Sequence, residues 1–430
     1  MNAAPGRATD AVRGRATDAA PESRTDAAPE QAGVQDVVIV GAGAVGLLLA
    51  CLLTQRGLRV VVLERRTSPG ARTRAIGIHP PGLRALDAAG VGAEVRRLGV
   101  PIRDGVVTCE GHELGRLAFA AHPIWSLPQC DTEALLEAQL ASLAPHALRR
   151  GHAVTGLVEC DPAVEPGPAV EPGPADPPGP ADPPGDCVEV WCDPPVAGAP
   201  LRARYVVGAD GVRSAVRTLA GIGWLPRRGS AEYIMGDSDD TTDAPATALL
   251  GFEPAGVVES FPLPGGRRRW VAWVRRTPVP LTPSALATVV AARTGASVDL
   301  ATASEPSAFS ARQHLADRFA RGRIALAGDA AHEVSPIGGQ GMNLGWLDAV
   351  RLADELERAL AAGAPSAPFG AYDRARRNAA LRATRQAAFN MAMGAPAAGR
   401  RLPARNRLVR VLAVWPLRTV LASAFTMRRL

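Results

Sequence analysis

A glycine-rich turn lies between two runs of β-branched residues near the start of the chain. Gly41, Gly43 and Gly46 follow the pattern Gly-x-Gly-x-x-Gly, and Ala44 and Val45 stand between the last two glycines. Gly41 permits a tight turn, Gly43 lets the backbone approach a pyrophosphate, and Gly46 allows close packing of helix on strand. Free N–H groups at the start of that helix would attract phosphate oxygens. The spacing therefore predicts a dinucleotide site.

An acidic residue closes the second β-branched run. Glu64 can accept hydrogen bonds from a ribose diol, whereas a 2′-phosphate there would be repelled. We assign Arg65, the next residue, to the same site. This first motif does not distinguish FAD from a nicotinamide dinucleotide.

A second glycine-rich constellation favours FAD. A buried strand is expected to deliver Gly328 and Asp329, whose carboxylate can bind a polyol chain. A glycine loop then leads into a helix, and its backbone N–H groups would face a ring edge that gains negative charge on reduction. A flavin needs such a locus and a nicotinamide does not. The residues assigned to it are Gly339, Gly341, Met342 and Asn343.

With a third segment, Val207 to Ser214, these motifs make the chain resemble the class A flavoprotein monooxygenases, the family of para-hydroxybenzoate hydroxylase and phenol hydroxylase. The three motifs occur in the family's order, and the resemblance runs from about Val37 to about Leu360. It implies FAD as the cofactor.

The resemblance also implies roles for particular residues. Asp210 and Arg217 would border the cofactor groove, and Arg74 would lie near the FAD phosphates and ribityl chain. Gln129 resembles the family glutamine that touches FAD, and Pro336 the proline beside the isoalloxazine ring. No side chain is assigned as catalytic, because the chemistry is centred on the flavin.

The reaction that the resemblance implies uses NADH or NADPH and O2 to hydroxylate an aromatic, polyketide or quinone-like small molecule through a flavin C4a-hydroperoxide. The sequence has no second dinucleotide fingerprint, so NAD(P)H is expected to bind transiently in the shared groove. Two alternatives remain open here. One is a flavin-dependent reductase of an isoprenoid-type substrate, and the other is a non-catalytic flavin-binding protein.

Several single residues have a plainer interpretation beside the functional one. His332 is expected to be structural rather than a catalytic base, and Ser214 a helix N-cap rather than a nucleophile. Trp270 and Trp273 would face opposite sides of a strand, one in the core and the other a candidate for the substrate cavity.

The elements that position these residues predict an α/β fold. Strand, turn, helix and strand alternate from residue 36, and a strand-rich stretch separates them from the Gly328 strand. We expect a Rossmann-like, discontinuous FAD-binding domain that encloses a β-sheet substrate domain. The predicted segments are a disordered tail at 1–35, FAD-binding parts at 36–222 and 313–395, a β-rich substrate domain at 223–312, and C-terminal amphipathic helices at 396–430.

Two segments are compositionally unusual. The Pro/Gly-rich repeat at 161–186 is expected to be an overgrown, dispensable loop between paired strands. The segment from Arg400 mixes apolar residues with arginines. It could make weak peripheral contact with an anionic membrane surface, but we favour a helix pair that covers the flavin domain.

The composition excludes several kinds of chemistry. The 430-residue chain has 48 basic residues, 42 acidic residues and a formal net charge of +6, and every basic residue is arginine. Without lysine, Schiff-base catalysis and a Walker-type phosphate lysine are impossible. Because the arginines are spread among acidic residues, we expect no nucleic-acid partner.

The six cysteines form no Cys-x-x-Cys pair, which favours reduced thiols over a disulfide framework, and no metal cluster stands out. The N-terminus lacks the apolar core of a signal peptide, and no stretch reaches the ~18 apolar residues of a spanning helix. We therefore expect a cytoplasmic protein, acting as a monomer or homodimer.

Overall fold

The computed structural model describes residues 33–70, 75–119, 121–160, 187–196, 198–337 and 339–414, with residues 417 and 427. The predicted loop 161–186 lies outside these ranges, as does the predicted tail except for residues 33–35. Residue 35 already belongs to the first strand.

The first sheet has a parallel centre whose strands come from distant parts of the chain. Strand β1 (Gln35–Val40) pairs in parallel with β2 (Val60–Glu64) on one side and β11 (Leu201–Gly208) on the other. Strand β20 (Ile324–Leu326) adds in parallel beyond β11. Continuous Val/Ile runs suit strands covered on both faces. The other strands of this eight-stranded sheet are β8 (Leu148–Arg150), β9 (Ala153–Glu159), β10 (Val188–Asp193) and β19 (Ala320–Arg321).

The strands that flank the Pro/Gly-rich segment pair with each other, as predicted. Strands β9 and β10 are antiparallel, and β10 continues onto the edge of β11. The thiols of Cys160 and Cys187 lie opposite each other at the end of this ladder, with 2.6 Å between their sulfur atoms.

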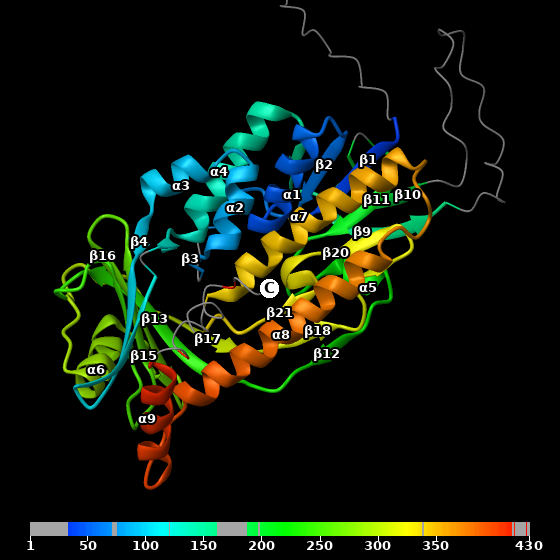
Figure 1. Ribbon diagram of the computed structural model, residues 1–430. Helices are drawn as coiled ribbons and strands as arrows, with labels where there is room; N and C mark the ends of the chain where they lie inside the picture. The colour runs from blue at the N-terminus through cyan, green and yellow to red at the C-terminus, as the bar shows by residue number, and fades with distance from the viewer. Residues whose placement is uncertain are drawn as a thin grey trace, which may run out of the picture. The chain divides into compact units, whose positions relative to one another are not determined.

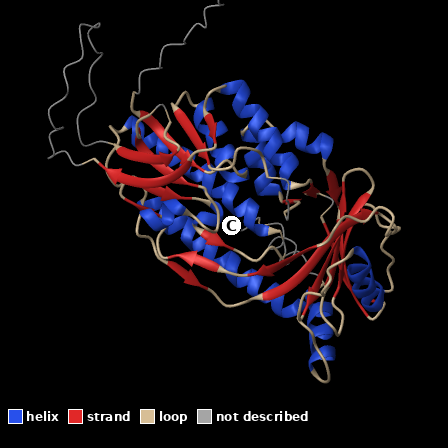
Figure 2. Cartoon of the chain, turned by 180° about the vertical axis from the view of Figure 1, so that it is seen from behind, coloured by secondary structure: helices blue, strands red, loops and turns tan. Residues whose placement is uncertain are grey.

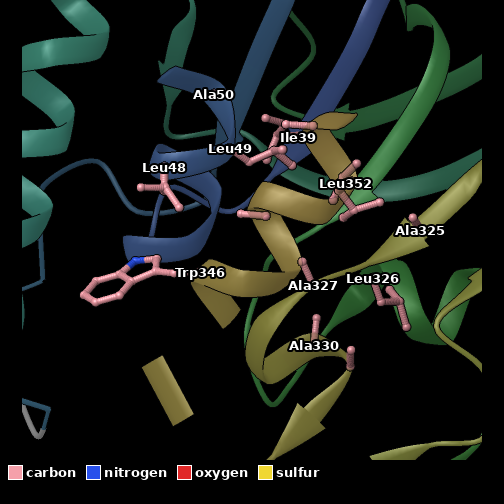
Figure 3. Packing of buried hydrophobic residues seen from close by; sticks show 14 of the residues in the cluster. Ile39, Leu48, Leu49, Ala50, Ala325, Leu326, Ala327, Ala330, Trp346 and Leu352 are labelled. Atoms are coloured by element: carbon pink, nitrogen blue, oxygen red, sulfur yellow. The ribbon is translucent and has the colours of Figure 1, made fainter. Parts of the chain in front are cut away.

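Two helices beside the first sheet pack directly against each other. Helices α1 (Ala44–Gln55) and α7 (Gln340–Ala361) meet where the indole N–H of Trp346 donates to the carbonyl oxygen of Ala44, 3.0 Å away. Figure 3 shows the interlocked apolar side chains here, among them Ile39, Leu48, Leu49, Leu352 and Leu326. This packing fixes the beginnings of α1 and α7 relative to each other.

The sequence pattern predicts one helix at 132–143 with Asp131 as its N-cap and another at 345–360, and both begin earlier in the structure. Helix α4 (Gln129–Leu143) starts after Pro128, so Asp131 lies in its first turn. Helix α7 begins directly after Gly339, which adopts a left-handed backbone with φ of 66°.

The second sheet has seven strands in the order β17-β13-β16-β15-β14-β5-β6. Helix α6 (Pro283–Thr294) covers one face of it, as Figure 2 shows from behind. The strands are β5 (Asp104–Cys109), β6 (His112–Ala118), β13 (Ala231–Asp239), β14 (Thr247–Gly251), β15 (Val258–Leu263), β16 (Arg267–Val274) and β17 (Ser307–Ala311).

The remaining elements connect or border the two sheets (Figure 1). Within the described ranges, no helix combines the length and the apolar character needed to cross a membrane. The short strands are β3 (Gly77–Ile78), β4 (Val100–Ile102), β7 (Ile124–Ser126), β12 (Trp224–Pro226), β18 (His314–Ala316) and β21 (His332–Glu333). The helices are α2 (Pro80–Ala88), α3 (Gly92–Leu98), α5 (Ala215–Leu219), the single turn η1 (Gly328–Ala330), α8 (Gly370–Gly394) and α9 (Arg401–Leu412).

The predicted α/β fold class is confirmed: a parallel sheet with helices and a separate, mainly antiparallel sheet are both present. The boundaries proposed for the domains stay a prediction. Two strands of the second sheet, β5 and β6, come from the segment that precedes residue 222.

Candidate functional site

The glycine turn between β1 and α1 is shaped by two very close backbone contacts. Gly41 has φ of 106°, and a Cβ on it would lie 2.4 Å from the carbonyl oxygen of Ala209. A Cβ on Gly46 would lie 2.0 Å from the carbonyl oxygen of Gly41. At Gly43, in contrast, a Cβ would come no closer than 3.7 Å to Glu133. Gly41 and Gly46 therefore build the turn, and Gly43 leaves space at its rim.

Glu64 stabilises this turn from the end of β2. Its carboxylate accepts hydrogen bonds from the backbone N–H of Ala42 at 2.9 Å and from the Arg66 guanidinium at 2.9 Å. Burial alone would raise the pKa of Glu64, but these bonds and the Arg66 charge hold it below its ordinary value. Arg65 and Arg66 are both exposed, and it is Arg66, next to the predicted Arg65, whose side chain pairs with Glu64.

A second carboxylate reaches the first turn of α1. Glu133 of α4 accepts from the backbone N–H of Ala44 at 3.1 Å and from the side-chain amide of Gln129 at 2.7 Å. Gln129 therefore lies at the predicted dinucleotide site. Glu133 was missed, although its position four residues after Gln129 places both on one face of the helix.

The Gly328–Asp329 turn is held by a buried ionic network. Asp348 of α7 is fully buried and accepts from the backbone N–H of Gly328 at 3.0 Å. It also bonds His332 Nε2 at 2.5 Å and Arg376 Nε at 2.6 Å. Burial opposes ionisation of Asp348, but its two partners hold its pKa below the ordinary value. The geometry fits the expected structural role of His332.

Arg217 joins this turn to the middle motif. Its guanidinium donates to the carbonyl oxygens of Ala330 at 2.9 Å and Val212 at 2.8 Å, and it lies over the ring of Trp224. Asp210 accepts from the first N–H groups of α5, including that of Ala215 at 2.7 Å. The described bonds of Asp210 thus stabilise the loop itself.

The loop after β21 leads into α7. Asn343 is fully buried, and its side chain donates to the carbonyl oxygens of Gly77 and Gly339 and accepts from the N–H of His79. These bonds fix the first turn of α7 against β3. The N-cap residue is Gly339, which has no side chain to cap the helix, so backbone N–H groups of this turn are available to a ligand.

A cavity of about 1080 Å³ connects these features to the second sheet. Its volume slightly exceeds the ~300–1,000 Å³ typical of a site for one small ligand. Of the residues assigned to the cofactor from the sequence, those that line it are Gly43, Ala44, Val45, Gln129, Asp329, Pro336, Gly339, Gly341 and Met342. The other described ones, which do not line it, are Gly41, Gly46, Glu64, Arg65, Asp210, Gly328 and Asn343. Arg74 lies outside the described residues.

The far wall of the cavity is the face of the seven-stranded sheet that α6 leaves uncovered. Its lining is mainly apolar, and the ionisable residues Glu259 and Arg269 also lie on it. Trp270 packs under α6, whereas Trp273 packs in the apolar cluster on the other face and does not line the cavity. The C-terminal helix α9 closes this end, where Val409 and Leu412 line the cavity.

A protein-family model described as FAD binding domain matches residues 34–169 and 196–387 of the chain. The chain belongs to this family. The resemblance to class A flavoprotein monooxygenases and the prediction of FAD as cofactor are thereby confirmed.

Relatives in the FAD binding domain family have related names. The chain is 32% identical to 12-dehydrotetracycline 5-monooxygenase/anhydrotetracycline 6-monooxygenase of Streptomyces rimosus, over 80% of this chain and 66% of that one. It is 30% identical to rifampicin monooxygenase of Streptomyces venezuelae, over 78% and 67% respectively. The chain therefore spans about two thirds of these relatives' lengths.

A solved structure of a hydroxylase is also similar to this chain. The OxyS anhydrotetracycline hydroxylase from Streptomyces rimosus superimposes with a TM-score of 0.71 at 27% identity, over 93% of this chain and 77% of that one. The fold agrees with family membership.

The residues present fit FAD. A Cβ on Gly341 would be 3.8 Å from its nearest neighbour, the carbonyl oxygen of Val334, so Gly43 and Gly341 both leave room where a ligand backbone would run. Asp329 is exposed and lines the same cavity. The backbone at Gly43 would hold the pyrophosphate, Asp329 the polyol chain, and Gly341 and Met342 the ring. The Ala44 N–H would join it by exchanging the Glu133 carboxylate for a phosphate oxygen.

Proposed function

We propose that this protein is an FAD-dependent monooxygenase that uses NAD(P)H and O2 to hydroxylate an aromatic, polyketide-like small molecule. The observation that carries the proposal is that one cavity runs from the dinucleotide turn at Gly43 to the apolar wall of the second sheet. A cofactor and a substrate can therefore occupy adjoining parts of a single space. The relatives' names, which specify tetracycline and rifampicin monooxygenases, support hydroxylation over reduction.

Bound FAD would supply the redox chemistry and the transfer of oxygen. The chain's own contribution is orientation and exclusion of water. The N-terminal turn of α7 presents N–H dipoles where negative charge would gather, and the apolar sheet face keeps water from the substrate's ring. NADH or NADPH is proposed as the reductant. Action as a monomer or homodimer, a cytoplasmic location and weak membrane contact stay predictions.

The activity is tested with FAD-saturated protein, NADH or NADPH, and a panel of polycyclic phenols and quinones that includes anhydrotetracycline. We expect NAD(P)H oxidation and O2 uptake in equal amounts, with one atom of ¹⁸O from labelled O2 in the product. Reduction of a panel member without O2 uptake would favour a reductase instead. Failure to retain FAD at all would contradict the proposal as a whole.

The cofactor site is tested separately with Asp329→Ala. Loss of the carboxylate should abolish stoichiometric FAD retention, while circular dichroism shows a folded chain. Asp354→Ala is the control, because Asp354 lies on the exposed side of α7 and pairs with Arg56. Full flavin content in Asp329→Ala would contradict the assignment.

A further inference from the structure

One row of residues crosses all the strands of the second sheet on its cavity face. The pairing register places these residues directly opposite one another from strand to strand. Each of them lines the cavity. In order across the sheet they are Ser307, Met235, Val271, Glu259, Leu250, Val107 and Gly115. Glu259, in the middle, is the one ionisable member of the row.

Glu259 has no compensating partner among the described residues. Only 5% of its surface is exposed, and its carboxylate accepts no described hydrogen bond. Arg269 lies on the same face of the sheet, two residues before Val271 on β16. Its guanidinium, however, binds both carboxylate oxygens of Asp237 at 2.7 and 2.8 Å. Burial raises the pKa of Glu259 to about 7. A carboxyl group in this state is suited to proton transfer near neutral pH.

The charged and titratable groups that face the same space come from several elements. Tyr233 of β13 does not line the cavity but is buried in the apolar cluster with Met235 and Val271, and burial together with the Glu259 charge raises its pKa. Elsewhere on the cavity wall the ionisable residues are His79, Arg269, Glu305, Arg312, Asp329 and Glu333.

Glu259 also lies close to the end of the cavity assigned to the flavin ring. Ile337, next to Pro336, belongs to the same apolar cluster as Met235 and Val271. Val271 is the direct cross-strand neighbour of Glu259. A planar ligand between the Pro336 loop and the sheet would therefore lie against the wall that carries Glu259.

We propose that Glu259 binds a hydroxyl group on the substrate's aromatic ring and accepts its proton during the reaction. In this step the substrate O–H bond breaks, its electron pair stays on the ring oxygen, and the proton bonds to the carboxylate. The added electron density makes the ring more reactive toward an electrophilic oxygen. The inference rests on the proposed monooxygenase function and narrows its substrate class to neutral phenols, since an aromatic carboxylate would meet a like charge here.

The contact is tested by ligand binding, without turnover. FAD-loaded wild type, Glu259→Leu, Glu259→Gln and Glu113→Gln are titrated with 4-nitrophenol and with nitrobenzene, which lacks the hydroxyl. Glu113 lies on β6 of the same sheet but is half exposed and outside the cavity lining. We expect Glu259→Leu to lose about tenfold in affinity for 4-nitrophenol, the worth of one hydrogen bond, with nitrobenzene unaffected. Glu113→Gln should match wild type.

Proton transfer is tested by pH and by rate. For wild type, 4-nitrophenol affinity should fall from pH 6 to pH 9, because both ligand and Glu259 would then be ionised. Glu259→Gln, which has no such charge, should bind the ionised ligand more tightly than wild type at pH 9. Glu259→Gln should also slow turnover of any phenol that the wild type hydroxylates, about a hundredfold to ten-thousandfold, at unchanged flavin content.

The outcomes separate this inference from the function on which it rests. Equal behaviour of 4-nitrophenol and nitrobenzene across the variants, or no binding of either to wild type, would overturn the assignment of Glu259. Normal turnover in Glu259→Gln would overturn the proton transfer while leaving the monooxygenase intact. Hydroxyl-dependent binding without hydroxylation of any panel member would instead remove the proposed function.

Discussion

One buried carboxylate, Asp348, holds the turn that presents Asp329 to the cavity. It does so without touching the cavity itself, through the backbone N–H of Gly328 and the side chains of His332 and Arg376. Removing one partner from a buried ionic network leaves the others uncompensated, which costs more than the network contributes as a whole.

We therefore expect Asp348→Asn to lower the free energy of unfolding by about 3–5 kcal/mol, because Arg376 would be left buried without its counter-ion. Urea denaturation of the FAD-loaded protein measures the change. Asp354→Asn on the same helix is the matched control, since its pair with Arg56 is partly exposed and worth about 1 kcal/mol or less. Equal effects of the two substitutions would contradict the role given to Asp348.

Glu259 should also leave a signature in the pH dependence of stability. Its pKa rises from 4.5 to about 7 on folding, so the folded state holds the extra proton between these values. Stability is therefore fully retained below about pH 4.5 and falls as the pH rises to about 7, by about 3 kcal/mol in total. Glu259→Gln should be more stable than wild type at pH 8 and similar at pH 4.5. A pH-independent difference in the free energy of unfolding would contradict this.

The turn between β1 and α1 divides its glycines into two kinds. Gly46 is pressed against the carbonyl of Gly41, whereas Gly43 has open space beside it. One glycine is thus needed for the packing of helix on strand and the other for access of a ligand.

Alanine substitutions should separate these two needs. Gly46→Ala forces α1 away from the turn and should cost about 1–3 kcal/mol of stability in the flavin-free protein. Gly43→Ala should leave that stability unchanged, because its backbone conformation suits alanine, yet weaken FAD binding. Thermal unfolding of the apoprotein and flavin titration measure the two effects. A large loss of apoprotein stability in Gly43→Ala would refute the division.

The two ends of the cavity differ in how they are closed. The dinucleotide end is built by α1, α4 and α7, and the substrate end by the second sheet and α9. Helix α9 is tied down by Arg405, whose buried guanidinium donates to the carbonyl oxygens of Phe252 and Ala395.

We expect Arg405→Met to loosen α9, since these carbonyl groups lose their donor at a cost of about 1–3 kcal/mol. Hydrogen exchange should quicken in α9, and water entry should divert NAD(P)H oxidation from product to H2O2 while FAD content stays normal. Arg410→Met, on the exposed face of α9, should behave as wild type. Unchanged exchange in Arg405→Met would show that α9 is held by other contacts.

The sequence predicted the dinucleotide end better than the substrate end, for a physical reason. Backbone geometry at Gly41 and Gly46 demands glycine, and such demands are local and visible as spacing. Glu133 reaches Ala44, which is far along the chain, and its spacing of four residues from Gln129 is the local sign of its position. Glu259 reaches the cavity through strand pairing across the second sheet, and nothing in its own stretch of sequence marks it. The C-terminal helices illustrate the same limit: the sequence suggested that they cover the flavin domain, whereas α9 packs against β6 and lines the substrate end of the cavity. Arg65 and Arg66 both follow β2, and the sequence alone did not show which of the two side chains would pair with Glu64.

The row of residues from Ser307 to Gly115, which crosses the second sheet, bears on how such a protein acquires new substrate specificities. Its members come from hairpins far apart in the chain, and none belongs to the nucleotide turn. A single base change in a codon for Val107, Leu250 or Met235 alters the shape of the substrate end of the cavity and leaves the residues of the FAD site unchanged. Selection can therefore vary the residues of this row one at a time while cofactor binding is kept.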